Sequence, residues 1–360
     1  MKIGVLGFFQ LRTMQYLTKY TDILDELNID YDVIHWSRSN DDIAPSFKGR
    51  HVVFNYEMIT EQPFYKKIGG FLKYAYFMRK TIKTNNYDKL IILTTQTAIP
   101  LCDLLLGKYR KKYIYGFYDL TKENKSLFYK LLVRKILESA RIVTISSFGF
   151  LPTLGLKSSD FIIQAHNTQK ISRMNAFKAK LSDKEPIRIS YWGIIRQLQY
   201  NKQLCDLFGN DKRFLLTYHG NGMYKELQLY CEKKNYGNIF FTGQYERKDI
   251  PGFITETDII SCLYENDRET KPTLAVKLYD AVKYKMPILL NYDSYVSVFA
   301  KNLSGAFAKK IDKKYPNAVY DWYKKLDRQN IEKGYKMMSE QIYQDDLLFK
   351  EELEKFLTVK

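Results

Sequence analysis

The chain has 360 residues, of which 45% are apolar, and its 57 Lys and Arg residues against 40 Asp and Glu residues give a net charge of +17. This length predicts two domains of ordinary size, and the composition excludes a disordered or low-complexity protein. The four cysteines are scattered without CxxC spacing, which excludes a disulfide framework and a cysteine-ligated zinc site. No segment has the character of a signal peptide or a membrane span, so we expect a cytoplasmic protein.

The first half of the chain alternates short apolar runs with amphipathic stretches. This alternation is typical of a parallel sheet that is covered by helices on both faces. Helices are predicted over residues 10–27, 64–83 and 125–139. The predicted strands of this half are 2–8, 31–36, 51–55, 90–94, 112–117, 141–145 and 160–163.

The basic charge is concentrated in the middle of this half. Between residues 66 and 135 there are sixteen Lys or Arg and four Asp or Glu, a local excess of twelve. Residues 66–80 mix cations with aromatic rings, which suits an anionic membrane surface, where each cation contributes about 1 kcal/mol. Nucleic acid binding and a solvated helix with aromatic core residues are the alternatives. The cations assigned to the membrane or an acceptor are Lys66, Lys67, Lys73, Arg79 and Lys80.

The second half repeats the alternation after a polar, Lys-rich stretch. Its predicted strands are 187–192, 213–218, 239–241, 258–262 and 287–290, with helices between them. We therefore expect two doubly wound α/β domains. Their expected ranges are 1–170 and 187–335, with a linker over 171–186 and a C-terminal helix over 336–360 that can pack back on the first domain.

Residues 271–290 are the most informative segment. They predict a short helix with Pro272 in its first turn, where proline is tolerated, and then a buried strand. A helix start carries free N–H groups and partial positive charge, so it can receive a phosphate. Lys277 would neutralise further charge, and Asp280 would accept hydroxyl hydrogen bonds. A diphosphate linked to a ribose needs this combination, although an ordinary amphipathic crossover helix is the alternative.

The loops that follow the other predicted strands of this half carry glycines and polar residues. Doubly wound domains place ligands at the carboxyl ends of their strands, and glycine allows close backbone approach. Each loop alone is weak evidence, because most loop glycines only serve a turn. The loops contain Gly193 with Arg196, then His219–Gly222, then Gly243–Tyr245, then Tyr264–Asp267.

At these residues the chain resembles the GT-B glycosyltransferases, close to the family 4-like enzymes of bacterial capsule and exopolysaccharide synthesis. The resemblance implies two Rossmann-like domains that face an interdomain cleft, followed by C-terminal helices. It is carried by Tyr191–Arg196, Asn238–Gly243, Lys277–Ala281 and Met286–Ile288, and in the first half by Tyr113–Leu120 and Val143–Gly149.

The resemblance implies a donor site in the second domain. There the Gly193 loop approaches the phosphates, and Asp280 takes the place of a glutamate that holds the ribose hydroxyls. The chain departs from the family at Pro272, where a second glutamate is common. The implied donor-binding residues are Gly193, Lys202, His219, Gly220, Gly222, Gln244, Glu265, Thr273, Leu274 and Asp280, and the implied catalytic residues are Asp119, Arg196 and Lys277.

Asp119 follows a predicted strand and would serve as base or positioning group for an acceptor hydroxyl; a helix cap is its alternative role. His166 can reach the same cleft, although a lone histidine is more often structural. No DxD-type or His/Cys cluster stands out in the sequence. We therefore expect no cofactor and a metal-independent mechanism, in which the helix dipole, Arg196 and Lys277 stabilise the leaving diphosphate.

The sequence therefore predicts a hexosyltransferase, retaining and metal-independent, that uses a nucleotide-sugar, expected to be UDP-linked. The expected acceptor is a lipid-linked oligosaccharide or polysaccharide of bacterial surface-glycan synthesis. The enzyme would be peripheral at the inner face of the cell membrane and would not bind nucleic acid. A GT-B sugar-nucleotide epimerase and a non-catalytic GT-B partner protein are the alternatives, the latter favoured by Pro272.

Overall fold

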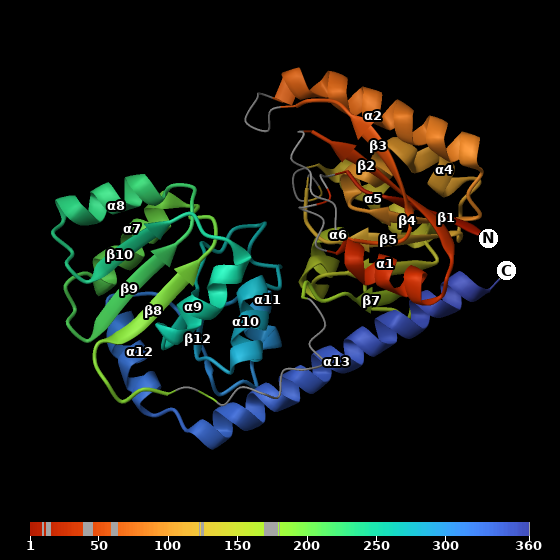
Figure 1. The fold of residues 1–360 in the computed structure, drawn as a ribbon. Coiled ribbons are helices and arrows are strands. Elements are labelled where there is room, and N and C mark those ends of the chain that lie inside the picture. Colours follow the sequence, from red (N-terminus) through yellow and green to blue (C-terminus); the bar gives the residue numbers. More distant parts are fainter. Residues whose placement is uncertain are drawn as a thin grey trace. The chain divides into compact units, whose positions relative to one another are not determined.

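The computed structural model describes residues 1–8, 11, 16–38, 46–58, 64–121, 123, 126–168, 179 and 181–359, with no side-chain description for residues 64–66. The chain divides into two compact units (Figure 1). Unit 1 comprises Met1–Gln169 and Gln344–Lys360, and unit 2 comprises Lys170–Tyr343.

Unit 1 contains a seven-stranded sheet in the order β3-β2-β1-β4-β5-β6-β7, and all of its strand pairs are parallel. The sequence order of the strands therefore reverses between β1 and β4. The strands are β1 (Lys2–Leu6), β2 (Asp30–Ser37), β3 (Arg50–Asn55), β4 (Lys89–Leu93), β5 (Tyr113–Phe117), β6 (Ile142–Ile145) and β7 (Ile162–Gln164).

Helices cover both faces of this sheet, because successive strand residues point to opposite faces and both sets are apolar. On one face α2, α4 and α5 bury Tyr74, Leu105 and Val133. On the other face α1 and the end of the C-terminal helix bury Tyr20 and Phe349. The helices before β7 are α1 (Leu17–Glu26), α2 (Phe64–Asn85), α3 (Thr95–Ala98), η2 (Ile99–Leu101), α4 (Cys102–Leu106), α5 (Leu127–Ser139), η3 (Phe148–Phe150) and α6 (Leu151–Leu154).

Unit 2 contains a six-stranded parallel sheet in the order β10-β9-β8-β11-β12-β13, so its sequence order reverses between β8 and β11. Its strands are β8 (Ile187–Trp192), β9 (Phe214–His219), β10 (Ile239–Gly243), β11 (Ile259–Cys262), β12 (Ile288–Asn291) and β13 (Ala306–Lys309). Its helices are α7 (Leu198–Phe208), α8 (Tyr224–Lys233), η5 (Arg247–Asp249), α9 (Ile250–Thr255), α10 (Val276–Tyr284), α11 (Tyr295–Phe299) and α12 (Tyr315–Lys324).

The last helix, α13 (Arg328–Thr358), contributes to the cores of both units. Its first part buries Ile331 and Tyr335 in unit 2, and its last part buries Phe349 and Leu353 in unit 1. The boundary between the units falls after Tyr343, whereas the sequence prediction ended the second domain at residue 335. An uninterrupted helical pattern gives no local signal for such a boundary.

The predicted α/β class with two doubly wound sheets is confirmed by these strand orders. Two local predictions were wrong. Strand β13 was not predicted, because Ala306–Lys309 is short and partly exposed at the sheet edge. Helix α10 begins at Val276 and not at Pro272, because the preceding residues form turns in which the Asp267 side chain accepts from the backbone N–H groups of Glu269 and Thr270.

Parts of other predictions lie outside the described residues. The predicted helix over 10–27 is described from residue 16 onward, apart from Leu11, and starts at Leu17. Most of the predicted linker over 171–186 is also outside them. Within the described part of the chain, no helix combines the length and apolar character needed to cross a membrane.

Candidate functional site

The loops at the carboxyl ends of β8, β9 and β10 continue the hydrogen-bond ladder beyond the strands. The N–H of Gly193 donates to the carbonyl of His219 at 2.9 Å, and the N–H of Ile195 donates to Asn221 at 2.8 Å. The N–H of Gly220 donates to the carbonyl of Gly243 at 2.7 Å. These bonds hold the loops side by side at the reversal point of the sheet, where doubly wound folds bind ligands.

The glycines in these loops are required by backbone geometry. Gly193, Gly220 and Gly222 have φ angles of 144°, 148° and 86°, which side-chain-bearing residues rarely adopt. A Cβ atom on Gly220 would lie 1.8 Å from the carbonyl oxygen of Gly193, and one on Gly222 would lie 2.5 Å from that of Ile195. The loop after β9 therefore lies so close to the Gly193 loop that only glycine fits at positions 220 and 222.

Lys277 points at the Gly193 loop from the start of α10. A Cβ atom on Gly193 would lie 3.4 Å from Lys277 Nζ and equally far from the hydroxyl of Tyr191. The ammonium donates to the hydroxyl of Tyr264 and lies 4.1 Å and 4.7 Å from the ring centroids of Tyr191 and Tyr264. Lys277 is only 6% exposed and has no ion pair among the described residues.

Burial lowers the pKa of Lys277 to about 8, because a desolvated ammonium is disfavoured; nearby Cys262 and Asp280 act in the opposite direction. Aromatic faces and one hydroxyl compensate the charge only in part. A buried cation without a carboxylate partner, next to an open glycine backbone, is the arrangement that a phosphate group would complete.

Asp280 lies one turn further along α10. Its Oδ2 accepts a hydrogen bond from the indole nitrogen of Trp192 at 2.9 Å, which fixes the orientation of the carboxyl group. Burial raises its pKa, while the Trp192 hydrogen bond and the cations of Arg247, Lys277 and Lys283 lower it. An oriented carboxylate of this kind can accept hydrogen bonds from sugar hydroxyls.

His219 is a predicted donor-binding residue, and its imidazole is buried. Its Nδ1 lies 2.9 Å from the Thr242 hydroxyl, and its ring stacks on Phe253 with centroids 3.7 Å apart. Burial lowers its pKa to about 4, so the ring is neutral. His219 supports the Gly193 loop through its carbonyl, while its ring belongs to the packing beneath α9.

Gln197, which the sequence analysis missed, joins the Gly193 loop to the loop after β11. Its side chain accepts from the N–H of Glu265 at 2.9 Å and donates to Asp267 at 3.0 Å. Arg196, next to it, has an exposed side chain, and its carbonyl accepts from Asn201 at 2.6 Å. Gln197 therefore links the loop that contains Arg196 to the loop that contains Glu265.

Four further residues that were predicted to bind the donor lie in different surroundings. Gln244 is exposed after Gly243, and the Thr273 hydroxyl donates to the carbonyl of Thr270 at 2.7 Å. Leu274 is only 7% exposed and belongs to the apolar core. The structure does not bring Lys202 to the others, because its ammonium lies over the ring of Tyr230 on α8, 4.9 Å from the centroid.

The aromatic residues around Lys277 were also missed by sequence analysis. Tyr191, Trp192 and Tyr264 occupy the carboxyl ends of β8 and β11, and each contacts Lys277 or Asp280. The one sequence feature that could have identified them is their position at or just after the end of a predicted strand. In an apolar strand, however, an aromatic residue is indistinguishable from ordinary core.

In unit 1, Asp119 is exposed just after β5, and the ring of its neighbour Tyr118 stacks on Tyr16 at 3.5 Å. Asp119 does not cap α5, because Ser126 does so by accepting from the N–H of Tyr129. His166 is fully buried, and its Nε2 lies 2.8 Å from Asp345 on α13. The histidine therefore fastens α13 to unit 1.

Helix α2 presents both core and surface residues. Tyr74 is fully buried, whereas Leu72 and Tyr76 are 66% and 69% exposed. Lys80 is exposed and Lys67 half-buried, while the side chain of Lys66 lies outside the described residues.

Two of the predicted membrane cations on α2 contact side chains of unit 1. The Lys73 ammonium lies 4.6 Å from the ring centroid of Tyr56. Arg79 makes a bidentate ion pair with Asp103 at 2.6 Å, so this cation is already neutralised.

A second exposed apolar group was not predicted. At the start of α5, Leu127, Phe128 and Leu131 are 72%, 79% and 48% exposed. Because α2 and α5 cover the same face of the sheet and each precedes a parallel strand, their first halves lie toward the carboxyl edge of unit 1. We call Leu72, Tyr76, Leu127, Phe128 and Leu131 the α2–α5 apolar group. Near it, Lys130 is half-buried and Arg134 and Lys135 are exposed.

Among the described residues, no group of three or more His, Cys, Asp or Glu side chains is arranged to hold a metal ion.

No protein-family model matches the chain, and no curated protein sequence matches it. Solved structures do resemble it over its whole length. Sucrose-phosphate synthase from Thermosynechococcus elongatus has a TM-score of 0.76 at 10% identity, with 100% of both chains covered. Anabaena HepE in complex with UDP has a TM-score of 0.69 at 14% identity, again with 100% of both chains covered.

A third solved structure, the lipopolysaccharide outer core galactosyltransferase WaaB, has a TM-score of 0.65 at 13% identity and covers 99% of both chains. At such identities the likeness establishes the fold alone. The predicted GT-B fold is confirmed by these neighbours together with the two parallel sheets.

Proposed function

We propose that the protein is a glycosyltransferase that takes a sugar from a UDP-linked donor held in unit 2. The observation that carries the proposal is the ammonium of Lys277, which is buried beside the backbone of Gly193 and makes no ion pair within the described part of the chain. It lies at the reversal point of a doubly wound sheet, where such folds bind nucleotides. The neighbouring fold in HepE, whose structures hold UDP and UDP-glucose, supports this choice of donor.

In this proposal, the donor diphosphate lies against the Gly193 loop and the start of α10. Lys277 and Arg196 stabilise the negative charge that develops on the diphosphate as the glycosidic bond breaks. Asp280, oriented by Trp192, accepts hydrogen bonds from donor hydroxyls. We assign the stabilisation of the diphosphate to the chain's own cations. This assignment agrees with the metal-independent, retaining transfer that the sequence predicts.

We further propose that the acceptor is lipid-linked and that unit 1 docks on an anionic membrane at the inner face of the cell membrane. The α2–α5 apolar group supports this, because both helices expose large apolar side chains toward the same edge of unit 1, as a membrane-binding surface would. The neighbouring lysines and arginines would contact anionic headgroups. Asp119, exposed after β5, is the group that we assign to positioning the acceptor hydroxyl.

Calorimetry with UDP, UDP-sugars and other nucleotide-sugars, followed by transfer assays on lipid-linked acceptors, tests the function. We expect one UDP site per chain and sugar transfer that requires an acceptor. Conversion of the donor without an acceptor would identify an epimerase. Nucleotide binding without turnover would favour the non-catalytic partner, and the absence of any nucleotide binding would refute the donor site.

A further inference from the structure

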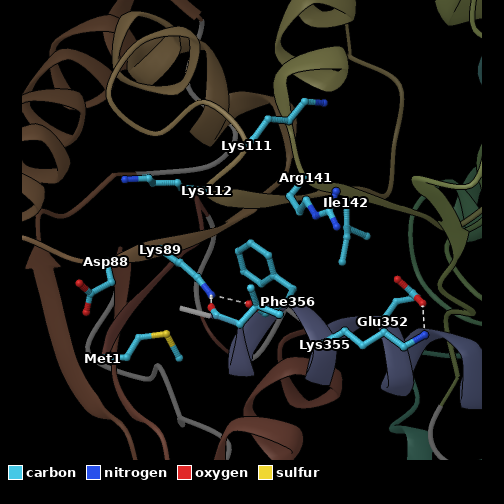
Figure 2. A pocket seen from close by; sticks show the side chains of 11 residues that line it. Met1, Asp88, Lys89, Lys111, Lys112, Arg141, Ile142, Glu352, Lys355 and Phe356 are labelled. Atoms are coloured by element: carbon cyan, nitrogen blue, oxygen red, sulfur yellow. Dashed lines mark hydrogen bonds and ion pairs between the residues drawn. The ribbon is translucent and has the colours of Figure 1, made fainter.

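A cavity of about 560 Å³ lies in unit 1, between the sheet and the end of α13 (Figure 2). This volume falls in the range of small-molecule sites and exceeds that of a single phosphate ion. The side chains that line it come from the starts of four strands, β1, β4, β5 and β6, and from the last turns of the helix. We call it the basic cavity; its charged lining residues are Asp88, Lys89, Lys111, Lys112, Arg141, Glu352 and Lys355.

The basic cavity is separate from the region assigned above to the acceptor. Lys89 begins β4, Lys112 precedes β5 and Arg141 precedes β6, so these residues mark the amino edge of the sheet. Asp119 follows β5 at the opposite edge. A five-residue strand such as β5 spans roughly 16 Å, which separates the two edges. The proposed transferase activity therefore leaves this cavity without a role.

Positive charge dominates the lining, with five cations against two carboxylates. Both carboxylates are engaged: Asp88 accepts from the N–H of Lys2 at 2.7 Å, and Glu352 pairs with Lys355 at 2.6 Å. For Lys112 and Arg141, the described part of the chain offers no hydrogen bond or ion pair from their side chains. The charge of these two side chains is therefore available to a ligand.

Lys89 and Lys111 are fixed in position by helix ends. Lys89 donates to the carbonyl of Phe356 at 2.5 Å and to that of Val359, as Figure 2 shows at the end of α13. Lys111 donates to the carbonyls of Glu138 and Ala140 at 2.8 Å and 2.9 Å. Burial lowers the pKa of both lysines, and Arg110 and Arg141 lower that of Lys111 further.

The crowding of like charges that lowers the pKa of Lys111 is a repulsion that a bound anion would relieve. The rest of the wall is apolar, with Ile142 and Phe356 both buried. An inorganic anion would use the cations and leave this apolar wall uncovered. A phosphate that carries a small apolar or ring group would contact both.

We infer that the basic cavity binds a small organic phosphate, with Lys112 and Arg141 contacting the phosphate and Phe356 and Ile142 contacting its organic group. The phosphate can belong to a soluble metabolite or to a lipid headgroup. Because the site lies at the amino edge of unit 1, binding there does not compete with the donor in unit 2. The inference does not depend on the proposed transferase function.

Phenyl phosphate is a suitable probe, because it combines a phosphate with an aromatic ring. It is titrated by calorimetry into the full-length chain that carries Lys277→Met, so that the proposed donor site is disabled without adding UDP, which is itself an organic phosphate. We expect one saturable site, tighter for phenyl phosphate than for inorganic phosphate, and no binding of phenol. The double variant Lys112→Glu and Arg141→Glu should weaken phenyl phosphate at least about tenfold, since each replaces a charge-assisted contact by repulsion.

The matched control is Lys212→Glu, which makes the same charge change at an exposed lysine of unit 2. It should leave phenyl phosphate binding unchanged, and thermal melting of all variants checks folding. The milder variant Arg141→Gln should give an intermediate loss. Absence of saturable phenyl phosphate binding, or equal weakening by Lys212→Glu, would overturn the inference.

Sedimentation with phosphatidylglycerol and phosphatidylcholine vesicles separates the two sources of phosphate. If a headgroup occupies the cavity, the double variant binds phosphatidylglycerol vesicles more weakly than the natural protein, and phenyl phosphate competes with these vesicles. If the ligand is soluble, vesicle binding is the same in the variant and the natural protein. In either case we expect the double variant to bind phenyl phosphate more weakly in calorimetry. Each vesicle result therefore supports the site and shows whether its phosphate comes from a lipid headgroup or from a soluble compound.

Discussion

The buried ammonium of Lys277 is unfavourable for folding, and the proposed binding site would explain why it is there. Its ammonium is buried among tyrosines and lies beside an open glycine backbone, where a structural lysine would have a carboxylate partner. The pKa of about 8, against the ordinary 10.5, measures what burial costs the charged form. A protein gains nothing in folding from such a group, so its presence points to a ligand.

Lys277→Met tests this interpretation. Methionine keeps the length and apolar stem of lysine without its charge, so the free energy of unfolding should be unchanged or higher. UDP affinity should fall at least about tenfold, since a buried phosphate would lose its charge-assisted contact. Chemical denaturation and UDP calorimetry measure the two effects. Lys283→Met, at an exposed position of the same helix, should alter neither; a strongly destabilised Lys277→Met protein would mark the lysine as structural.

The lowered pKa of Lys277 also predicts opposite responses of binding and stability to pH. Since UDP requires the ammonium, its affinity should fall as pH rises from about 7 to about 9. Between about 8 and the ordinary 10.5 the unfolded chain holds a proton that the folded chain has lost. The free energy of unfolding therefore gains a contribution that increases with pH in this window. Lys277→Met should abolish both contributions, and a pH-independent affinity in the natural protein would contradict the assignment.

At the scale of elements, the glycine loops and α10 form one unit of the site. Gly193 and Gly220 contact through their backbones, and this contact sets the distance between the Gly193 loop and its neighbour. A side chain on Gly220 would collide with the neighbouring loop. Adding a methyl group at Gly220 should therefore disturb the loops more than removing a single hydrogen bond would.

Gly220→Ala should distort these loops. Its Cβ would lie 1.8 Å from a carbonyl oxygen at a φ of 148°, so the free energy of unfolding should fall by about 2–4 kcal/mol. UDP binding should be lost as well. Gly237→Ala is the matched control, since nothing lies within 4 Å of an added Cβ there. Denaturation curves that coincide for the two variants would show that the close approach is not important.

The α2–α5 apolar group gives a second prediction at this scale. Leu72→Ser combined with Phe128→Ser should weaken binding to phosphatidylglycerol vesicles at least about a hundredfold, because each large side chain contributes about 2 kcal/mol when it enters a membrane interface. Both side chains are mostly exposed, so the melting temperature should not change. Leu229→Ser on α8, also 65% exposed, serves as control in a vesicle sedimentation assay. Equal binding by all three proteins would remove the membrane proposal.

At the scale of the whole molecule, the sequence was sufficient to predict structure that follows a repeating pattern. It was insufficient to predict contacts between residues far apart in the chain. Alternating apolar and amphipathic runs predicted two doubly wound sheets, because this periodicity reflects burial on both faces. The Gly193 loop was singled out from its position after a predicted strand, and Lys277 from its position near the start of a predicted helix. Nothing local shows that Gln197 bridges two loops, or that Lys202 turns toward Tyr230. Such choices depend on residues far apart in the chain.

Helix α13 was expected to pack back on the first domain, but nothing in its sequence marks which of its residues belong to which unit. Its last part completes the core of unit 1: Phe349 packs edge-on against Tyr20 at 5.4 Å, and Asp346 pairs with Lys19 at 2.8 Å. Unit 1 therefore requires residues 344–360 for its own stability, although they are far from its other residues in sequence.

Phe349→Ala should consequently destabilise unit 1 by about 3–5 kcal/mol, the usual cost of removing a buried phenyl ring. The adjacent variant Leu348→Ala should cost less than about 0.5 kcal/mol, because Leu348 is 47% exposed while Phe349 is 4% exposed. Hydrogen exchange of the two units separates the effects: the strands of unit 1 should lose protection, while those of unit 2, whose core uses the earlier turns of α13, should keep theirs. If both units lost protection equally, α13 would couple their unfolding, and the two cores would have to be treated as one cooperative structure.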